Sequence, residues 1–191
     1  MTNPLFVEVV GEEELTERVA QLGAEIRQDY EGREPVLVGV LNGSVPFMAD
    51  LFRHLDPTTE SEFLSLTRFG EEGRVSIALD TLEPIEGRDV LIVEDIVDTG
   101  LTLASLRRIL DTRNPSSVAV VTLLDKTNRR IVEVDVEYRG FEVGDEFLVG
   151  YGLDWDGRYR NLRSLYAVLD MGAFREDPGS LARELFGTGL R

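Results

Sequence analysis

The chain has 191 residues, of which 42% are hydrophobic and 29% charged, the composition of a globular protein of about one domain. Its formal net charge of −16 argues against a general nucleic-acid binder, which needs clustered positive charge to displace counterions from phosphates. The absence of cysteine excludes disulfides and thiolate metal sites, and no apolar run approaches the length of a membrane span, so we expect a cytoplasmic protein with neither nucleic-acid nor membrane partners.

The predicted elements alternate between helices and strands along the chain. Apolar residues at helical spacing predict a helix at 12–30, which precedes a buried strand at 36–41 and a helix at 45–54. Strands at 62–67 and 74–79 are joined by a short polar segment, which predicts a hairpin-like flap. The later elements are a strand at 90–94, a helix at 103–113, strands at 118–124, 132–138 and 147–149, and a short helix at 180–186. This order predicts an α/β fold with a parallel-centred sheet.

Residues 90–102 are the most informative segment. Val90–Val93 have the composition of a strand buried on both faces, and Glu94 and Asp95 follow at its carboxyl end, where ligands bind in open α/β sheets. The next loop, 98–102, offers backbone N–H groups and two threonine hydroxyls at a helix start, a site for phosphate. A ribose would separate the acids from the phosphate, with its hydroxyls on the carboxylates. The alternative is a buried strand that ends in an acidic helix-capping turn.

This segment resembles the binding signature for 5-phosphoribosyl 1-pyrophosphate (PRPP) in the type I phosphoribosyltransferases. Residues 38–44, 123–126 and 147–162 narrow the resemblance to the hypoxanthine/guanine phosphoribosyltransferases, in order and spacing, over most of residues 5–170. The resemblance implies the type I phosphoribosyltransferase fold in a single domain, residues 1–191. Its parts would be a core at about 35–150 flanked by helices, a flap hairpin at about 66–76, and a small hood from the N-terminal segment and about 147–175.

The implied reaction is the transfer of 5-phosphoribosyl from PRPP to hypoxanthine or guanine, with xanthine as a third candidate substrate, giving IMP or GMP and pyrophosphate. Mg²⁺ is the implied cofactor, and a homodimer or homotetramer is the implied assembly. Glu94 and Asp95 would hold the ribose hydroxyls, directly or through the water shell of the metal. Asp98 would be the general base that takes a proton from the purine, or alternatively it only shapes the loop. Thr99, Gly100, the Leu101 amide and Thr102 would cradle the 5′-phosphate.

The resemblance also assigns residues to the purine base. Lys126 is the only lysine among twenty basic residues, and it would hydrogen-bond the oxygen at purine C6, which discriminates against adenine. Phe147 would stack on the base, with core packing as the alternative, and Leu148 would offer backbone groups to the far edge of the base. Ile96 would pack on the other face of the base. Asp154 would bind Mg²⁺ beside the purine, with a turn acid as the alternative.

The pyrophosphate site departs from the common pattern of the family. Gly43 and Ser44 would turn their amides toward the diphosphate, but Asn42 stands where the family usually has lysine or arginine. Arg68 lies in the flap where a Ser-Tyr pair is common, and it would supply the missing charge or else remain a solvated hairpin arginine. Arg160 would also contact pyrophosphate.

Two other functions stay open on the sequence. One is an RNA-binding regulator of the pyrimidine-operon type with uracil phosphoribosyltransferase activity, although a net charge of −16 leaves little basic surface for RNA. The other is a ligand-binding paralogue with weak or lost catalysis, which the changes at Asn42 and Arg68-Phe69 keep open.

Overall fold

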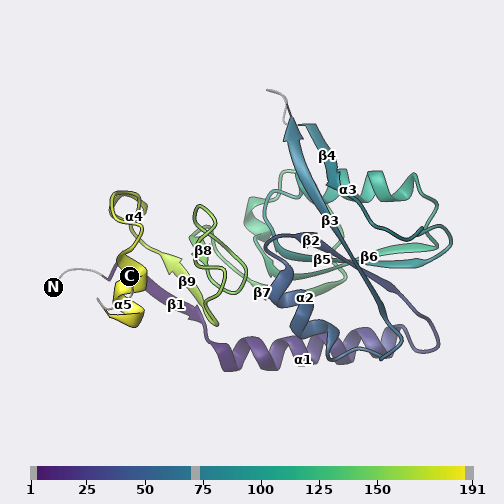
Figure 1. Ribbon diagram of the computed structural model, residues 1–191, viewed down its shortest axis with the longest axis horizontal. Helices are drawn as coiled ribbons and strands as arrows, with labels where there is room; N and C mark the ends of the chain where they lie inside the picture. The colour runs from purple at the N-terminus through teal and green to yellow at the C-terminus, as the bar shows by residue number, and fades with distance from the viewer. Residues whose placement is uncertain (1–3, 70–73, 188–191) are drawn as a thin grey trace. The chain divides into compact units, whose positions relative to one another are not determined.

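The computed structural model describes residues 4–69 and 74–187 (Figure 1). The chain divides into two compact units, one made of residues 16–145 and the other of residues 1–15 with 146–191. The single-domain organisation expected from the sequence stays a prediction.

The larger unit contains a six-stranded sheet in the order β4-β3-β2-β5-β6-β7. All neighbouring strands run parallel except β4, which is antiparallel to β3. The strands are β2 (Val36–Leu41), β3 (Glu60–Phe69), β4 (Arg74–Leu79), β5 (Asp89–Val97), β6 (Ser117–Asp125) and β7 (Tyr138–Glu142). This confirms the predicted α/β class with a parallel-centred sheet.

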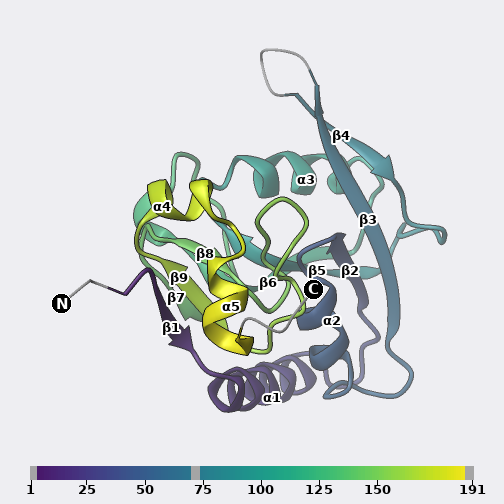
Figure 2. The ribbon, with the colours of Figure 1, turned by 60° about the vertical axis from the view of Figure 1, so that its left-hand side comes forward.

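Helices cover both faces of this sheet. The helices α1 (Glu12–Asp29) and α2 (Val45–Phe52) lie on one side of it, and α3 (Leu101–Asp111) lies on the other (Figures 1 and 2). A single turn of 3₁₀ helix, η1 (Thr127–Arg129), follows β6. The strand β5 is buried on both faces, since Val90, Leu91, Ile92 and Val93 are all fully buried. A parallel strand between two helical layers reads as such an unbroken apolar run.

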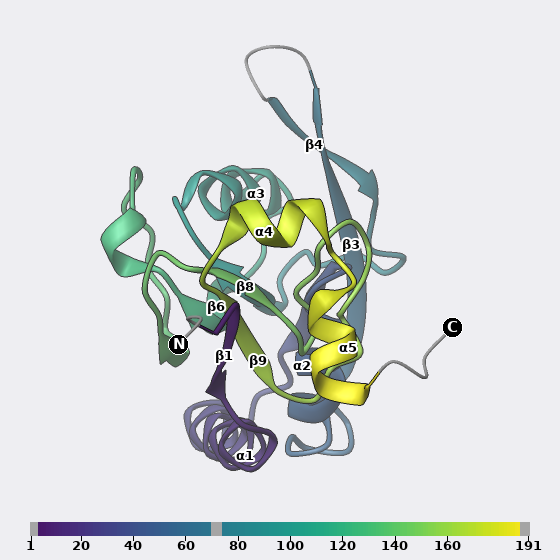
Figure 3. The same cartoon turned by 90° about the vertical axis from the view of Figure 1, so that its left-hand side faces the viewer.

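The smaller unit contains a three-stranded antiparallel sheet in the order β1-β9-β8 (Figure 3). Its elements are β1 (Phe6–Val10), β8 (Phe147–Val149), β9 (Leu165–Val168), α4 (Met171–Glu176) and α5 (Ser180–Phe186). Phe174 of α4 and Leu181 of α5 are fully buried in one cluster with Phe6 and Val149. The two short helices therefore cover the core of this unit. None of the helices in residues 4–69 and 74–187 has both the length and the apolar character that a membrane crossing needs.

One predicted strand, at 132–138, is wrong. Only Tyr138 of that segment lies in a strand, although exposed and half-buried residues alternate along 131–137 as in a strand. Val134 and Val136 pack against the core, but their backbone pairs with no described strand. Instead, the Asp135 carbonyl accepts a hydrogen bond from the Arg107 side chain, and the Glu137 carboxylate accepts one from the Val120 amide. Alternation of buried and exposed residues indicates that one face of a segment is buried, but it does not show that the segment pairs with another strand.

Other boundaries moved by a few residues. The strand β5 continues to Val97, so Glu94 and Asp95 lie within its last four residues, and α3 begins at Leu101 and not at Leu103. The structure confirms the strands predicted at 36–41, 74–79 and 147–149 and the helix predicted at 180–186. The sequence did not predict β1, β9, α4, η1 or the part of β7 after Tyr138.

Candidate active site

The carboxyl end of β5 lines a cavity of about 420 Å³. It is bounded by the ends of β2 and β3, the loop after β5 and the first turn of α3. Its lining includes Ile96, which the sequence assigned to the base, and most of the residues assigned to the sugar phosphate, namely Glu94, Asp95, Asp98, Thr99, Gly100 and Thr102. In a parallel sheet the carboxyl ends of the strands share one edge, which is where ligands of open α/β sheets bind.

Glu94 is a buried acid without a protein partner. Glu94 is only 7% exposed, and its carboxylate accepts no hydrogen bond from any residue in the described ranges. Burial raises the pKa of Glu94 well above its usual value, and the negative charge of Asp95 raises it further. Buried polar groups in folded proteins are normally satisfied. Glu94 is therefore prepared for a ligand that donates hydrogen bonds or carries positive charge.

Asp95 and Gly43 bring two loops into close contact. One carboxylate oxygen of Asp95 accepts a hydrogen bond from the Ile96 amide at 2.8 Å, and the other faces Gly43. A Cβ built on Gly43 would lie 1.5 Å from Asp95 Oδ2, so any other residue there would displace the Asp95 carboxylate. The loop after β2 thus lies directly against an acid of β5.

The rest of the predicted pyrophosphate loop is mixed in character. The Leu41–Asn42 peptide bond is cis, and Asn42 is exposed. Ser44 is fully buried, and its hydroxyl donates to the Val40 carbonyl at 2.6 Å. The Ser44 hydroxyl thus serves the protein itself, which leaves the backbone amides of this loop as the groups that could meet a diphosphate.

The loop after β5 has the geometry of a phosphate nest. Gly100 has φ +81°, and a Cβ there would lie 2.4 Å from the Val132 carbonyl oxygen, so glycine is required twice over. The Thr99 carbonyl accepts from the amides of Ile131 and Val132 at 3.0 and 3.2 Å. The amides of Thr99, Gly100 and Leu101 donate to no residue in 4–69 or 74–187. Free amides at a helix start attract an anion.

Asp98, the predicted general base, is held by an arginine that the sequence reading did not assign. Arg129 Nε lies 2.8 Å from Asp98 Oδ1, and both side chains are less than half exposed. The neighbouring Arg130 donates to the backbone carbonyls of Val97 and Asp98 and to the Asp125 carboxylate. The only signal for these two residues was the Arg-Arg pair three residues after Lys126, in a chain where arginine is common.

Lys126 directly follows β6. It is 6% exposed, and its amide donates to the Val97 carbonyl at 2.9 Å. Ile96 and Val97 of β5 pair with Leu124 and Asp125 of β6, which places Lys126 one residue beyond the pairing. The residue predicted to read the purine oxygen is therefore joined through the backbone to the start of the phosphate loop.

The smaller unit contains the remaining predicted residues. Phe147 packs edge to face on Trp155, with ring centroids 5.5 Å apart, and Leu148 is 7% exposed. Asp154 accepts from the Gly157 amide at 2.7 Å and pairs with Arg160 at 2.8 Å. Both alternatives raised for Phe147 and Asp154, core packing and a turn acid, are thus present as contacts.

Arg160 also donates to the Gly152 carbonyl at 2.6 Å. Arg68 lies near the end of β3, but its side chain is outside the described residues. Within residues 4–69 and 74–187, no cluster of three or more His, Cys, Asp or Glu side chains could hold a metal ion by itself. Two adjacent carboxylates, Glu94 and Asp95, still suit Mg²⁺, which takes one or two protein carboxylates and completes its shell with water and substrate phosphates.

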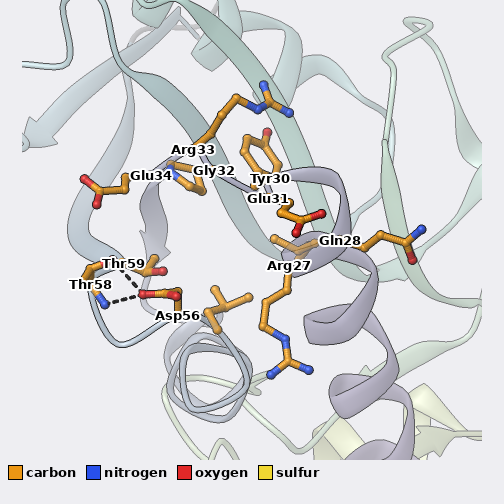
Figure 4. A pocket seen from close by; sticks show the side chains of 13 residues that line it. Arg27, Gln28, Tyr30, Glu31, Gly32, Arg33, Glu34, Asp56, Thr58 and Thr59 are labelled. Carbon is orange, nitrogen blue, oxygen red and sulfur yellow. Dashed lines mark hydrogen bonds between the residues drawn. The ribbon is translucent and has the colours of Figure 1, made fainter.

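A larger cavity, of about 760 Å³, lies away from these residues (Figure 4). It is formed by the end of α1 and by the turns before β2 and β3, with Arg27, Arg33 and Asp56 among its lining. Asp56 accepts from both the amide and the hydroxyl of Thr58. Because β2 and β3 begin there, this cavity lies at the amino-terminal edge of the sheet, and size alone does not mark the site.

Comparison with known proteins gives the same assignment as the site. Residues 11–156 match the phosphoribosyl transferase domain family. A hypoxanthine-guanine phosphoribosyltransferase of Streptococcus pneumoniae is 43% identical over 166 residues, which cover 85% of this chain and 92% of that protein. A bifunctional protein TilS/HprT of Listeria monocytogenes is 45% identical over 166 residues, and the chain spans about a quarter (26%) of its length.

The solved structures show the same likeness in three dimensions. A hypoxanthine-guanine phosphoribosyltransferase from Bacillus anthracis, with a HEPES molecule in its active site, superposes with a TM-score of 0.83 at 40% identity. The match covers 85% of this chain and 98% of that one.

Proposed function

This chain belongs to the phosphoribosyltransferase family, in its hypoxanthine-guanine branch, and we propose that it transfers 5-phosphoribosyl from PRPP to hypoxanthine or guanine. The products are IMP or GMP and pyrophosphate, and xanthine is a third candidate acceptor. This is a purine salvage reaction.

The observation that carries the proposal is that Glu94 and the phosphate nest line the same cavity. The buried Glu94 carboxylate lines one cavity together with Thr99 and Gly100, whose amides donate to no described residue, and only a few residues separate them along the chain. Ribose 5-phosphate has complementary groups, because its hydroxyls donate to carboxylates and its phosphate accepts from amides. A free nucleobase or a simple anion would satisfy only one half of this arrangement.

The chemistry requires a bond to break at C1′ of the ribose and another to form to a purine nitrogen. Such glycosyl transfers pass through an oxocarbenium-like state, so the leaving pyrophosphate gathers negative charge. When bound by Glu94 and Asp95, Mg²⁺ would neutralise that charge. Asp98 takes the proton that the purine loses. Arg129 would hold this carboxylate through Oδ1, which lies 2.8 Å from its Nε.

The remaining assignments are part of the same proposal. Lys126 recognises the oxygen at purine C6, and Ile96, Phe147 and Leu148 contact the base. Asp154 is a second metal ligand. Pyrophosphate contacts come from Arg160 and, at the flap, from Arg68, which compensates for the neutral Asn42. The cytoplasmic location and the homodimeric or homotetrameric assembly stay predictions.

The test is an assay of the purified chain with PRPP, Mg²⁺ and five bases: hypoxanthine, guanine, xanthine, adenine and uracil. We expect pyrophosphate release with the oxopurines and little with adenine or uracil. Turnover of uracil together with RNA retention on a filter would instead support the regulator. Tight PRPP binding without turnover of any base would support the paralogue that has lost catalysis.

A further inference from the structure

We propose that Arg130 is a positioning residue that fixes the phosphate loop and the base-reading lysine to one another. The inference rests on the proposed function. It goes beyond it in giving a role to a side chain that does not line the cavity, through its hydrogen bonds to the backbone of the loop.

Arg130 joins three groups of the protein at the edge of the active site. One guanidinium nitrogen donates to the Val97 carbonyl at 2.8 Å and to the Asp98 carbonyl. The other pairs with the Asp125 carboxylate. The Arg130 side chain is 10% exposed and Asp125 is fully buried, so these contacts are shielded from water. Charge-assisted hydrogen bonds to an arginine fork are strong and fix direction as well as distance.

The segment 126–132, which we call the anchor segment, binds every carbonyl at the start of the phosphate loop. The Val97 carbonyl accepts from the Lys126 amide as well as from Arg130, and the Thr99 carbonyl accepts from the amides of Ile131 and Val132. A peptide plane is rigid, so fixing the carbonyl on one side fixes the amide on the other. The anchor segment thereby sets the direction of the free amides at Thr99 and Gly100, which share peptide planes with the carbonyls of Asp98 and Thr99.

Asp125 extends the same linkage to the purine side. It precedes Lys126, and its second oxygen faces Arg139 Nε at 2.5 Å. A buried carboxylate needs compensating charge, and here two arginines supply it. Only Arg130 also reaches the loop carbonyls. Arg139 touches the same carboxylate from β7 with a side chain 43% exposed, and it is therefore a matched control.

The competing explanation is that Arg130 only neutralises Asp125. Lysine would serve that purpose, because a single ammonium can pair with one carboxylate. Lysine lacks the planar fork that can bond two carbonyls and a carboxylate at once. Arg130→Lys and Arg130→Gln therefore separate charge from geometry.

The experiment compares Arg130→Gln, Arg130→Lys and Arg139→Gln with the wild type in two measurements. The first is steady-state kinetics with PRPP and hypoxanthine. We expect Arg130→Gln to lower kcat/KM for PRPP by about 100-fold, as small misplacements of catalytic groups do. Arg130→Lys should recover only part of this, while Arg139→Gln should stay close to the wild type. Equal kinetics for Arg130→Gln and Arg139→Gln would overturn the proposal.

The second measurement is amide hydrogen exchange in the anchor segment, which needs no activity. Exchange at Lys126, Ile131 and Val132 should be about tenfold faster in Arg130→Gln, since loss of a hydrogen-bonded contact lowers local opening free energies. It should be unchanged in Arg139→Gln. Unchanged exchange in both variants would refute the positioning role, even if the wild type proved inactive and the proposed function failed.

A double variant guards against misfolding. Arg130→Gln alone leaves the buried Asp125 less compensated, whereas Asp125→Asn with Arg130→Gln removes both charges together. If the double variant folds with wild-type thermal stability but keeps the kinetic and exchange defects, positioning is supported. If it regains wild-type kinetics, the defect came from the unpaired charge and the proposal fails.

Discussion

Replacing Glu94 with glutamine should stabilise the ligand-free protein at neutral pH while it abolishes most activity. The folded protein holds the Glu94 proton more tightly than the unfolded chain, because burial and then the charge of Asp95 raise its pKa well above the usual 4.5. Between pH 4.5 and that raised pKa, unfolding releases a proton, so the stability of the wild type falls as the pH rises. Because glutamine cannot ionise, the stability of the variant does not fall with pH for this reason.

The magnitude follows from the size of the pKa shift. Each unit by which the folded pKa exceeds 4.5 costs the wild type about 1.4 kcal/mol above that pKa. For a domain of this size, 1 kcal/mol corresponds to a Tm change of about 2–4 °C. The variant should therefore match the wild type near pH 4 and have the higher Tm at pH 8.

The assay is thermal unfolding of both proteins across that pH range, without PRPP or Mg²⁺. Asp95→Asn serves as a control. It removes the charge that raises the pKa of Glu94 in addition to burial, so it should reduce the pH dependence of stability without abolishing it. A stability difference between Glu94→Gln and the wild type that stays constant from pH 4 to pH 8 would refute the reasoning.

Three further predictions concern the loops and the base. Gly43→Ala places a Cβ on the Asp95 carboxylate, so we expect a loss of about 1–3 kcal/mol and a raised KM for PRPP. Its control is Gly172→Ala, where the nearest atom lies at 3.2 Å; equal Tm values would contradict the clash. Asp98→Asn should lower kcat by about 100-fold or more with little change in PRPP binding, and unchanged kcat would exclude the general base. Lys126→Gln should lower kcat/KM for hypoxanthine by at least about 100-fold and narrow its preference over adenine; an unchanged ratio would remove Lys126 from base recognition.

The central sheet, and the gathering of residues 94–102 around one cavity at its edge, were predictable because each depends on local sequence. Four consecutive apolar residues at Val90–Val93 have no reason to cluster unless the strand is buried on both faces. Glycine at 100 is needed both for its positive φ and for its close contact with the Val132 carbonyl, so this glycine indicates the loop in the sequence itself.

The misses arise where the structure depends on contacts distant in sequence. Val134 and Val136 alternate with exposed residues as in a strand because they pack on the core, but their backbone pairs with no strand of the described residues. Arg130 acts through carbonyls 32 and 33 residues away, and nothing in its own neighbourhood distinguishes it from the other arginines.

The most direct test of the account is calorimetric titration of PRPP, with and without Mg²⁺, into the wild type and into the Glu94→Gln/Asp95→Asn double variant. We predict one PRPP per chain, binding that is tighter with Mg²⁺, and a loss of at least about 100-fold in the double variant, since hydrogen bonds to charged groups contribute roughly 1.5–3 kcal/mol each. Equal affinity of the two proteins for PRPP would contradict the assignment of these carboxylates to the ribose.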